Sequence, residues 1–551
     1  MGFQVSPGVN VSEVDLTTII PAVSTTTGAF AGHFRWGPVG QRVLLDSEDS
    51  LAKNFQHPTS NNAVDFFTAA NFLAYGNALY TVRVVNEGGV AASNTARARN
   101  ATSNAANTKN TIIKNEDDYD NNYSSGISAV GSWVAKYPGS LGNSLRVSVC
   151  QSANAFESTI TGACAFTNNS VTVTFTTATS VNTKVVAGDI LVLGPDRKSI
   201  KIASVTGNTV TLASKYVGNT GTQATTTRRW EYFDYVPSAP GTSGVVAAAG
   251  SSNDEIHIAV IDEDGLVTGL PNTILEIFPN LSKATSARDE TGTDIYYKTS
   301  INKNSRYVWW AAHITGLTNI GRIYNTPSLN YSAGTASLPT AVSLTQGYDG
   351  VLPRATDYIN GYNMFRDAEK VDVSLILGGA SDATRAVHII NNIVEYRKDC
   401  VAVFSPRQAD VVNNSGYSGS EVDDIVAFRD SLPSTSYAVL DSGWKQQYDK
   451  YRDLFIYVPC NGDTAGTMVR TDIERDPWYS PAGYNRGQIK NVIKLAYNPG
   501  KTDRDQLYKR GINPIVTFPG EGTILFGDKT LLTKPSVAPS GQNSRSSKRS
   551  C

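Results

Sequence analysis

The sequence predicts a multidomain protein in which a discontinuous α/β core, with a mostly parallel or mixed sheet, carries inserted β-rich peripheral domains. Its 551 residues exceed what one hydrophobic core usually holds. The apolar runs 371–377 and 401–404 are typical of strands buried on both faces, and a helical pattern over 382–398 lies between them. In the middle of the chain, short alternating runs separated by turns indicate antiparallel β-structure.

The amino-terminal region divides into an arm and a compact unit. Residues 1–27 are expected to form an extended arm, because they contain too little apolar surface to fold alone. The compact unit, residues 28–87, predicts a strand through Phe34, helices over 46–55 and 62–75, and a strand over 78–85. This βαβ-like unit has no complete partner nearby, so we expect strands from later in the chain to finish its sheet.

A peripheral β-rich domain is predicted over residues 132–338, after a linker over 88–131 that is rich in Ala, Asn, Ser and Thr. Evenly spaced short strands predict a small barrel or sandwich inserted at about 165–228. Strands over 255–261 and 266–269 are expected to form a hairpin through Asp262 to Gly265. Trp309 and Trp310 belong to a predicted core strand, with a binding platform for carbohydrate or a partner as the alternative.

The second part of the core is predicted over residues 339–534. Strands over 437–440 and 454–458 extend the α/β layer, and a helix is expected over 421–430. A helix over 503–510 ends at Gly511, a normal capping position. Strands over 513–518 and 523–526 then form a hairpin through Pro519 to Gly522. Residues 535–551 are predicted to be a disordered tail.

Composition excludes several classes of function. The formal net charge of -1 gives no general attraction to nucleic acid or to an anionic membrane. The first residues lack the basic and apolar regions of a secretory signal, and we find no apolar run long enough to span a bilayer, so we expect a soluble protein made in a cytoplasm. The five cysteines lack C-x-x-C spacing and the five histidines are dispersed, so neither a metal site nor a cofactor is predicted. Free, buried thiols are expected, with a Cys150–Cys164 contact across a hairpin left open.

An α/β core raises the question of catalysis, because ligands bind at the carboxyl ends of its strands. Candidate residues do follow the predicted strands there: Gly378, Gly379, Ser381, Asp382, Ser405, Pro406, Arg407 and Asp441. A nucleophile would need a base within reach, and these neighbourhoods contain no histidine. His388 is expected to be a packed helix residue, and the acidic runs 116–118 and 423–424 a solvated surface rather than a cation site. We therefore predict a protein that is not an enzyme.

Two sets of short strings, one at each end of the chain, carry a family resemblance. Near the carboxyl end these are WYSPAGYNRG (478–487), LY (507–508), GINP (511–514), GEGTILFG (520–527) and KT (529–530). Near the amino end they are SPGV (6–9), FAGHFRWGP (30–38) and NFLAYGN (71–77), with YPGSLGN (137–143) between the two sets. In this order they resemble the contractile-tail sheath proteins of bacteriophages, well at both ends and in patches in the middle.

The resemblance implies a structural subunit of a hollow helical sheath around a phage tail tube. Such a sheath is assembled in an extended state in the host cytoplasm, becomes part of the virion, and contracts to drive the tube through the host envelope. Its implied partners are copies of itself, the tail tube protein, and the baseplate and tail terminator proteins. Nucleic acid, direct membrane insertion and cofactors are not implied.

Three sets of site residues follow from these considerations. The subunit-linking arm is assigned Val9, Val11 and Val14, which would add a strand to a neighbour's sheet. The tail-tube docking surface is assigned Arg486, Lys490, Lys494, Lys501, Arg504, Lys509 and Arg510, with a merely solvated face as the alternative. The acceptor hairpin is assigned Ile515, Thr517, Thr523 and Leu525.

Two further expectations concern the end of the chain and the class of protein. The family continues into further helix and strand after a string like Lys534-Pro535-Ser536, so we expect this 551-residue form to polymerise poorly unless the hairpin over 513–526 is a sufficient acceptor. A receptor- or carbohydrate-binding virion protein is the alternative function, and an α/β enzyme is a more distant one.

Overall fold

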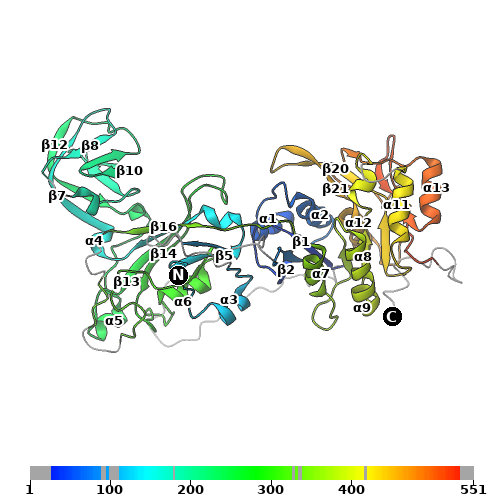
Figure 1. Cartoon of the computed structure of the whole chain (residues 1–551), viewed down its shortest axis with the longest axis horizontal. Helices are drawn as coiled ribbons and strands as arrows, with labels where there is room; N and C mark the ends of the chain where they lie inside the picture. The colour runs from blue at the N-terminus through cyan, green and yellow to red at the C-terminus, as the bar shows by residue number, and fades with distance from the viewer. Residues whose placement is uncertain are drawn as a thin grey trace. The chain divides into compact units, whose positions relative to one another are not determined.

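The computed structural model describes residues 26–88, 95–98, 111–128, 130–177, 180–324, 329–332, 338–414 and 419–533. The chain forms two compact units (Figure 1). The first unit contains residues 1–34, 40–84 and 353–551, and the second contains residues 35–39 and 85–352. The described residues form helices and several sheets, which confirms the predicted α/β and β multidomain class.

The first unit is built on a mixed seven-stranded sheet to which both ends of the chain contribute. Its order is β2 (Arg42–Leu45), β3 (Leu79–Val84), β1 (Gly28–His33), β17 (Leu375–Leu377), β18 (Val401–Phe404), β19 (Ala438–Asp441) and β23 (Ile512–Asn513). Neighbouring strands are parallel except for the antiparallel pair of β2 and β3. The two chain segments meet where Gly28 on β1 lies beside Leu375 on β17.

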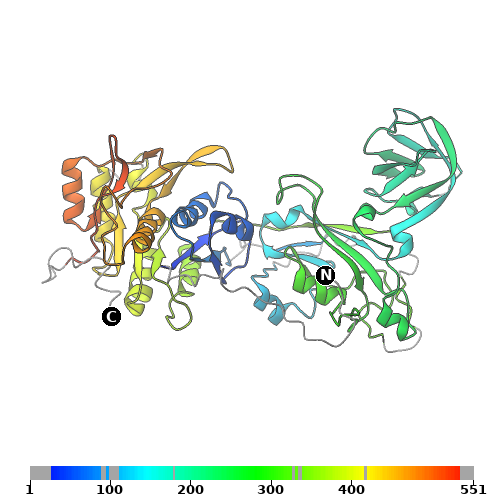
Figure 2. The same cartoon turned by 180° about the vertical axis from the view of Figure 1, so that it is seen from behind.

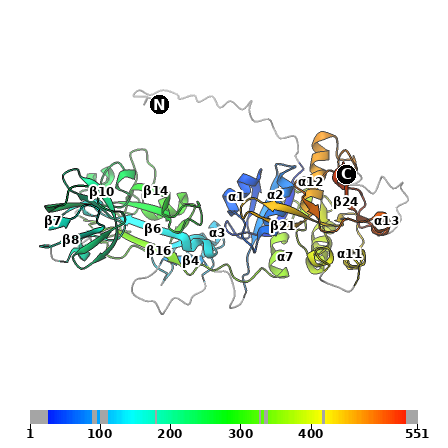
Figure 3. The same cartoon turned by 90° about the horizontal axis from the view of Figure 1, so that it is seen from above.

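Helices cover both faces of this sheet (Figure 3). Helices α1 (Glu48–Phe55), α2 (Ala63–Leu73) and α12 (Asn461–Glu474) pack on one face. The other face carries α7 (Ala355–Asn363), α8 (Ala383–Ile389) with its π-helical continuation Ile390–Val394 and α9 (Glu395–Arg397), and α11 (Glu421–Asp430). The sheet strands are apolar on both sides because both sides are covered.

The remaining elements of the first unit lie outside the seven-stranded sheet. A three-stranded sheet contains β20 (Trp444–Asp449), β21 (Leu454–Pro459) and β22 (Lys494–Leu495), and β24 (Ile515–Phe518) pairs with β25 (Gly522–Leu525). The two helices here are α10 (Gln408–Val411) and α13 (Lys501–Lys509). The expectation that 454–458 extends the α/β layer is wrong, because β21 pairs antiparallel with β20, and β23 occupies the place beside β19.

The second unit contains another seven-stranded sheet and a barrel. The sheet order is β14 (Thr273–Ser282), β13 (Glu255–Asp262), β6 (Leu145–Cys150), β16 (Thr340–Thr345), β4 (Thr95–Ala98), β5 (Trp133–Pro138) and β15 (Val308–Trp310). The α-helices of this unit are α3 (Glu116–Asn122), α4 (Ala153–Phe156), α5 (Gly244–Ala248) and α6 (Tyr297–Asn304), and short 3₁₀ turns cover 140–144, 181–183 and 233–235.

The inserted barrel is closed by six antiparallel strands (Figure 2). Its order is β10 (Lys198–Thr206), β11 (Thr209–Leu212), β8 (Thr172–Phe175), β7 (Glu157–Phe166), β12 (Gly221–Arg229) and β9 (Ile190–Leu193). It therefore extends over 157–229, beyond the expected bounds of 165–228. The first and last strands in chain order, β7 and β12, are rich in Thr and carry polar side chains on their outer faces. Their sequences therefore show little of the apolar alternation that predicts a strand.

Three further expectations for the second unit are corrected by its strand pairing. Residues 88–131 are not simply a linker, since β4 and α3 lie there and β4 pairs with β5. The unit does not end at 338, because β16 pairs with β6 and β4. The strand expected over 266–269 is a turn, and β14 pairs with β13 instead. There the Asp262 carboxylate accepts the N–H groups of Val267 (3.0 Å) and Thr268 (2.7 Å), which competes with strand pairing.

The tryptophan pair belongs to the core of the second unit. Trp309 and Trp310 are 1% and 4% exposed. The Trp309 ring stacks on Tyr119 at a centroid distance of 4.2 Å, and its indole N–H donates to the Lys136 carbonyl at 2.9 Å. The alternative of a binding platform on these two rings is wrong, because neither ring offers a free face to a ligand.

Cys150, Cys164, Cys400 and Cys460 are free and buried, so Cys150 and Cys164 do not form a disulfide, while Cys551 lies outside the described residues. Within the described ranges, none of the helices has the length and apolar character that a bilayer crossing requires.

A comparison of two fragments tests the assigned extent of the second unit. Residues 85–352 should unfold cooperatively on heating, whereas residues 132–338 should not, because the shorter fragment lacks β16 and β4 from the middle of the sheet. Both fragments lack the buried Trp36, and the shorter fragment also lacks α3, whose Tyr119 stacks on Trp309, so the comparison tests residues 85–131 and 339–352 together. Calorimetry distinguishes them, and equal cooperative transitions would contradict the role of β16 and β4.

Candidate assembly surface

The carboxyl ends of the core strands, where an α/β enzyme would bind substrate, are filled by a buried polar network. Asp441 accepts hydrogen bonds from the hydroxyls of Ser405 (3.0 Å) and Thr464 (3.0 Å) and from the Gly443 N–H (3.0 Å). Asn461, at the start of α12, donates its side-chain N–H to the Gly379 carbonyl at 2.9 Å and its backbone N–H to Ser405 Oγ at 2.9 Å. Helix α12 is thereby fixed across the ends of β17, β18 and β19.

A buried ion pair continues this network. Lys445 Nζ lies 2.9 Å from both carboxylate oxygens of Asp463, and neither side chain is more than 1% exposed. The Tyr75 hydroxyl donates to Asp463 at 3.1 Å and accepts the Lys490 N–H at 2.6 Å. Burial raises the pKa of Asp463, an effect that Lys445 opposes, and burial raises the pKa of Asp441 to about 7.

The other polar residues considered for catalysis have structural roles. The Ser381 hydroxyl donates to the Gly378 carbonyl at 2.6 Å, and Asp382 caps α8 by accepting the Arg385 N–H at 2.8 Å. Arg407 donates to Asp410 through its backbone N–H at 2.9 Å. His388 Nε2 lies 2.8 Å from Asn363 Oδ1. These hydrogen bonds fix the ends of helices and engage the groups that catalysis would require.

An exposed aromatic surface lies beside the β24–β25 hairpin. We define it as Tyr484, Phe518 and Phe526, whose ring centroids are 5.5 to 5.9 Å apart, with Arg504 Cζ 5.4 Å from the Phe518 ring centroid. Tyr484 and Phe526 are 46% and 41% exposed. Aromatic and arginine side chains are enriched where proteins bind one another.

The local sequence explains how this surface forms. Phe518 ends β24 at the turn of the hairpin and Phe526 follows β25 at its open end, and their ring centroids lie 5.5 Å apart. Tyr484 is held against them because the neighbouring Gly483 donates its N–H to the Leu525 carbonyl at 2.9 Å. Gly483 has a φ of 101°, which explains the glycine at this position.

A second exposed aromatic pair precedes this surface in the chain. Trp478 and Tyr479 are 62% and 43% exposed. Arg486 donates to the Ser480 carbonyl at 2.7 Å, and its Cζ lies 5.7 Å from the Tyr479 ring centroid. Arg486 therefore holds this turn in place.

The basic residues assigned to tail-tube docking do not form one uniform face. Arg486 and Lys490 stabilise the fold. Lys490 Nζ donates to the carbonyl of Ala74, the residue that follows α2, at 2.7 Å. Lys494 lies on β22, and the remaining four lie on or directly after α13. Of these, Arg510 lies 3.7 Å from Asp430, while Arg504 contacts the aromatic surface. Lys501 and Lys509 are exposed.

The hairpin assigned as the acceptor has side chains and chain segments on both of its edges. Ile515 and Leu525 are buried and paired, and the hydroxyls of Thr517 and Thr523 lie 2.8 Å apart. Along the outer edge of β25, the Leu525 N–H donates to the Gly487 carbonyl (2.7 Å) and the Thr523 carbonyl accepts the Ile489 N–H (2.9 Å).

The outer edge of β24 is capped by side chains. The Asn498 carboxamide accepts the Thr517 N–H at 2.9 Å and donates to the Thr517 carbonyl at 3.4 Å, as a neighbouring strand would. Ser442 Oγ accepts the Ile515 N–H at 2.9 Å. A strand added to β24 would therefore have to displace Asn498.

The sequence reasoning missed the aromatic surface and the Asn498 cap. Tyr484 and Phe526 belong to strings that we recognised by family likeness, and their clustering depends on the hairpin register. Val9, Val11 and Val14 lie outside the described residues. In the described part of the chain, no three His, Cys, Asp or Glu side chains are grouped so that they could hold a metal ion.

Sequence comparisons match this chain to phage tail sheath proteins. Residues 354–531 match the family model described as "Phage tail sheath protein central domain". The chain is 28% identical to the tail sheath protein of Salmonella phage ViI, over 97% of this chain and 81% of that protein. It is 29% identical to the tail sheath protein of Enterobacteria phage T4, over 96% of this chain and 82% of that protein. A crystal structure of a sheath tail protein from Listeria innocua aligns over 95% of this chain and 73% of that one, with a TM-score of 0.46 and 10% identity.

The polar groups at the strand ends are engaged in hydrogen bonds within the fold, and exposed aromatic and basic side chains lie beside the hairpin. The chain is similar to phage tail sheath proteins over nearly its whole length, and residues 354–531 match the central domain of that family.

Replacing Asp441 tests the buried network through pH. The pKa of Asp441 is about 7 in the folded chain and near its ordinary value of about 3.9 when unfolded, so the folded state holds the proton more tightly. Its contribution to stability is complete below about pH 4 and is lost as the pH rises towards 7. As the pH rises from about 4 to 7, the free energy of unfolding of Asp441→Asn should increase relative to that of the wild type by up to about 4 kcal/mol. This follows because one pKa unit corresponds to about 1.4 kcal/mol.

Urea unfolding at pH 4 and pH 7 measures this difference. Asp505→Asn, on the exposed face of α13, is the matched control. If the difference in free energy of unfolding between wild type and Asp441→Asn did not change with pH, the conclusion that Asp441 is buried and protonated would be wrong.

Replacing Asn498 tests the capped edge of β24. Asn498→Ala should promote self-association, because it exposes the N–H and C=O of Thr517 to another strand. Light scattering at rising concentration should show growth at lower concentrations than for the wild type, with little change in melting temperature. Asn485→Ala, at another exposed position, is the control. Equal scattering by wild type and Asn498→Ala would show that Asn498 does not prevent another strand from pairing with β24.

Proposed function

We propose that this protein is the subunit of a contractile sheath that polymerises helically around a phage tail tube and contracts to drive the tube through the host envelope. The observation that carries the proposal is the tail sheath match over 354–531, the segment that contains the aromatic surface and the hairpin. The wider similarity to tail sheath proteins over 96–97% of the chain supports it.

Contraction of this kind needs no fuel molecule and no catalytic site. The same subunit packs in two lattices, the extended lattice is kinetically trapped, and the compact lattice buries more surface. Rigid units joined by flexible connections suit such a change, because they can slide while remaining linked. The division of the chain into two compact units supports this part of the proposal.

We assign partners to particular surfaces. Copies of this chain are linked through the arm, where Val9, Val11 and Val14 add a strand to a neighbour's sheet. The tail tube protein contacts the aromatic surface and the basic residues on or directly after α13, namely Lys501, Arg504, Lys509 and Arg510. Baseplate and tail terminator proteins bind the ends of the sheath. The protein is assembled in the host cytoplasm, resides in the virion tail and is not an enzyme.

Electron microscopy of the chain mixed with purified tail tubes tests both the function and the surface. The wild type should coat the tubes as a regular sheath of uniform diameter. The variant Tyr484→Ser/Phe526→Ser should lose at least tenfold in tube coverage at equal concentration, because exposed aromatic side chains dominate binding surfaces. Its melting temperature should change little.

Tyr396→Ser is the matched control, since Tyr396 is 62% exposed on α9, away from the aromatic surface. Normal coating by the double variant would exclude the aromatic surface as the tube contact. No coating by the wild type, combined with binding to host surface glycans, would favour the receptor-binding alternative.

A further inference from the structure

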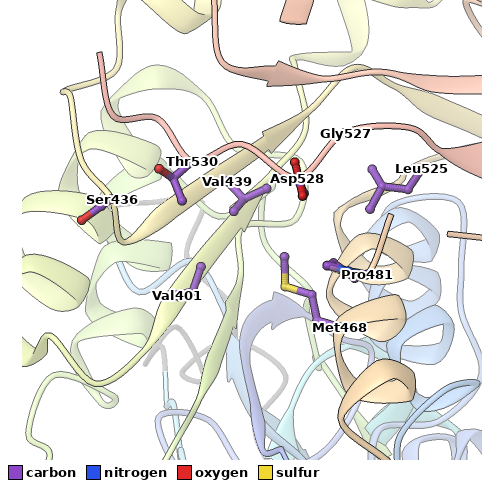
Figure 4. Close-up of a pocket in the computed structure, with 9 residues that line it drawn as sticks. All are labelled: Val401, Ser436, Val439, Met468, Pro481, Leu525, Gly527, Asp528 and Thr530. Atoms are coloured by element: carbon purple, nitrogen blue, oxygen red, sulfur yellow. The ribbon is translucent and has the colours of Figure 1, made fainter. Parts of the chain in front are cut away.

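Two of the hollows in the described part of the chain differ in what they could hold. The smaller lies in the first unit between Val401, Val439 and Met468 (Figure 4), and its volume of about 20 Å³ has room for one water molecule. The larger is an open cleft of about 720 Å³ in the second unit, between the barrel and the edge strand β14 of the seven-stranded sheet. Sites for small molecules usually have volumes of about 300 to 1,000 Å³, so of these two only the cleft could hold a ligand.

The barrel and the sheet each provide one wall of this cleft. Ser199 and Lys201 on β10 face it, because they alternate with an isoleucine that is buried in the barrel. The strand register places Ile190 of β9 directly beside Lys201. Asn272 and Ile274, at the start of β14, line the opposite wall. Polar and apolar side chains are therefore mixed on both sides of the cleft.

An ion-paired carboxylate links the two walls. Glu231 lies just beyond β12, and its two carboxylate oxygens are each 3.2 Å from Arg146 Nη2 on β6 of the sheet. The Lys201 ammonium on β10 of the barrel contacts the same carboxylate. Only 10% of the Glu231 side chain is exposed, so solvent screens these contacts less than it would on an open surface. A cleft whose walls are fixed in this way loses little conformational freedom when a ligand binds.

The short 3₁₀ turn at 233–235 adds two side chains that the fold does not use. Tyr235 is 65% exposed, and Asp234 is exposed as well. Neither the Asp234 carboxylate nor the Tyr235 hydroxyl has a hydrogen-bond partner among the described residues. Asn272 accepts a hydrogen bond from Arg146 at 3.5 Å, which leaves its amide N–H groups to donate. The cleft thus offers an aromatic ring, an acceptor and a donor.

The charges and the apolar area of the cleft define the class of ligand. The positive charges of Arg146 and Lys201 balance the negative charges of Glu231 and Asp234, so the cleft favours a neutral ligand over an ion. Its apolar lining consists of two isoleucines and the tyrosine rings, which is too little for a wholly apolar ligand. The ligand must therefore be neutral, rich in hydrogen-bonding groups, and flat enough on one side to stack on an aromatic ring.

We propose that this cleft binds a neutral oligosaccharide. A sugar ring has an apolar C–H face that stacks on the negative face of the Tyr235 ring, and hydroxyl groups around its edge that both donate and accept. These hydroxyls donate to the Asp234 carboxylate and accept from the Asn272 amide. The site belongs to the second unit alone and is independent of the proposed function in a sheath.

An array of immobilised neutral, sialylated and sulfated oligosaccharides, probed with the labelled full-length chain, tests the class of ligand. The wild type should give at least tenfold more signal on one or more neutral oligosaccharides than on any acidic one, because the cleft carries no net positive charge to attract an anion. Binding to acidic oligosaccharides alone would overturn the proposal, as would an array without binding.

A double variant tests whether the cleft is the site. Asp234→Ala/Tyr235→Ser should lower the affinity for the neutral oligosaccharide that binds best at least tenfold, as measured by saturation-transfer NMR, because it removes both the stacking face and the acceptor. Both side chains are exposed, so the melting temperature should change little. Tyr396→Ser, at a tyrosine that is 62% exposed on α9 of the first unit, is the control and should bind as the wild type does. Equal affinities of the wild type and the double variant would overturn the assignment of this cleft.

Discussion

The close packing of α12 against α2 is the contact on which the first unit depends, because it joins segments nearly 400 residues apart. Gly462 and Gly466, one turn apart on α12, make it possible. A Cβ at Gly462 would lie 2.4 Å from the Thr68 carbonyl oxygen, and one at Gly466 would lie 2.3 Å from the Tyr75 ring. The two helices therefore approach more closely than larger residues would permit. This approach brings Tyr75 to Asp463 and Lys490, so the buried network and the turn before the hairpin depend on the same contact.

The network at the strand ends shows how an enzyme-like architecture can serve a structural purpose. Asp441, Ser405 and Asn461 occupy the position where many α/β proteins bind ligands. Here Asn461 connects β17 to β18, and Asp441 connects β19 to α12. Buried polar groups tolerate little displacement, because every lost hydrogen bond leaves an unsatisfied partner. The network therefore favours one position of α12, and with it one position of the segment that leads to the aromatic surface.

Sequence patterns identified elements that are governed by local chemistry. The helix over 421–430 is found with the expected bounds, because Ser420 and Asp423 form a capping box. The hairpin through Pro519 to Gly522 forms between β24 and β25 as expected. The failures are long-range. Thr95–Ala98 has no apolar pattern and is a strand only because it lies between β16 and β5. The aromatic surface likewise depends on how the hairpin is seated against residues 483–489, which no local pattern encodes.

The edges and the surface of the hairpin differ in the kind of partner that each could accept. Main-chain groups on a strand edge bond to almost any extended peptide, so an open edge associates with little selectivity. Aromatic and arginine side chains require a surface of complementary shape and charge. In this chain the edge of β24 is closed by Asn498 and Ser442, whereas Tyr484 and Phe526 remain exposed. At this hairpin, association is thereby restricted to contacts that side chains can specify.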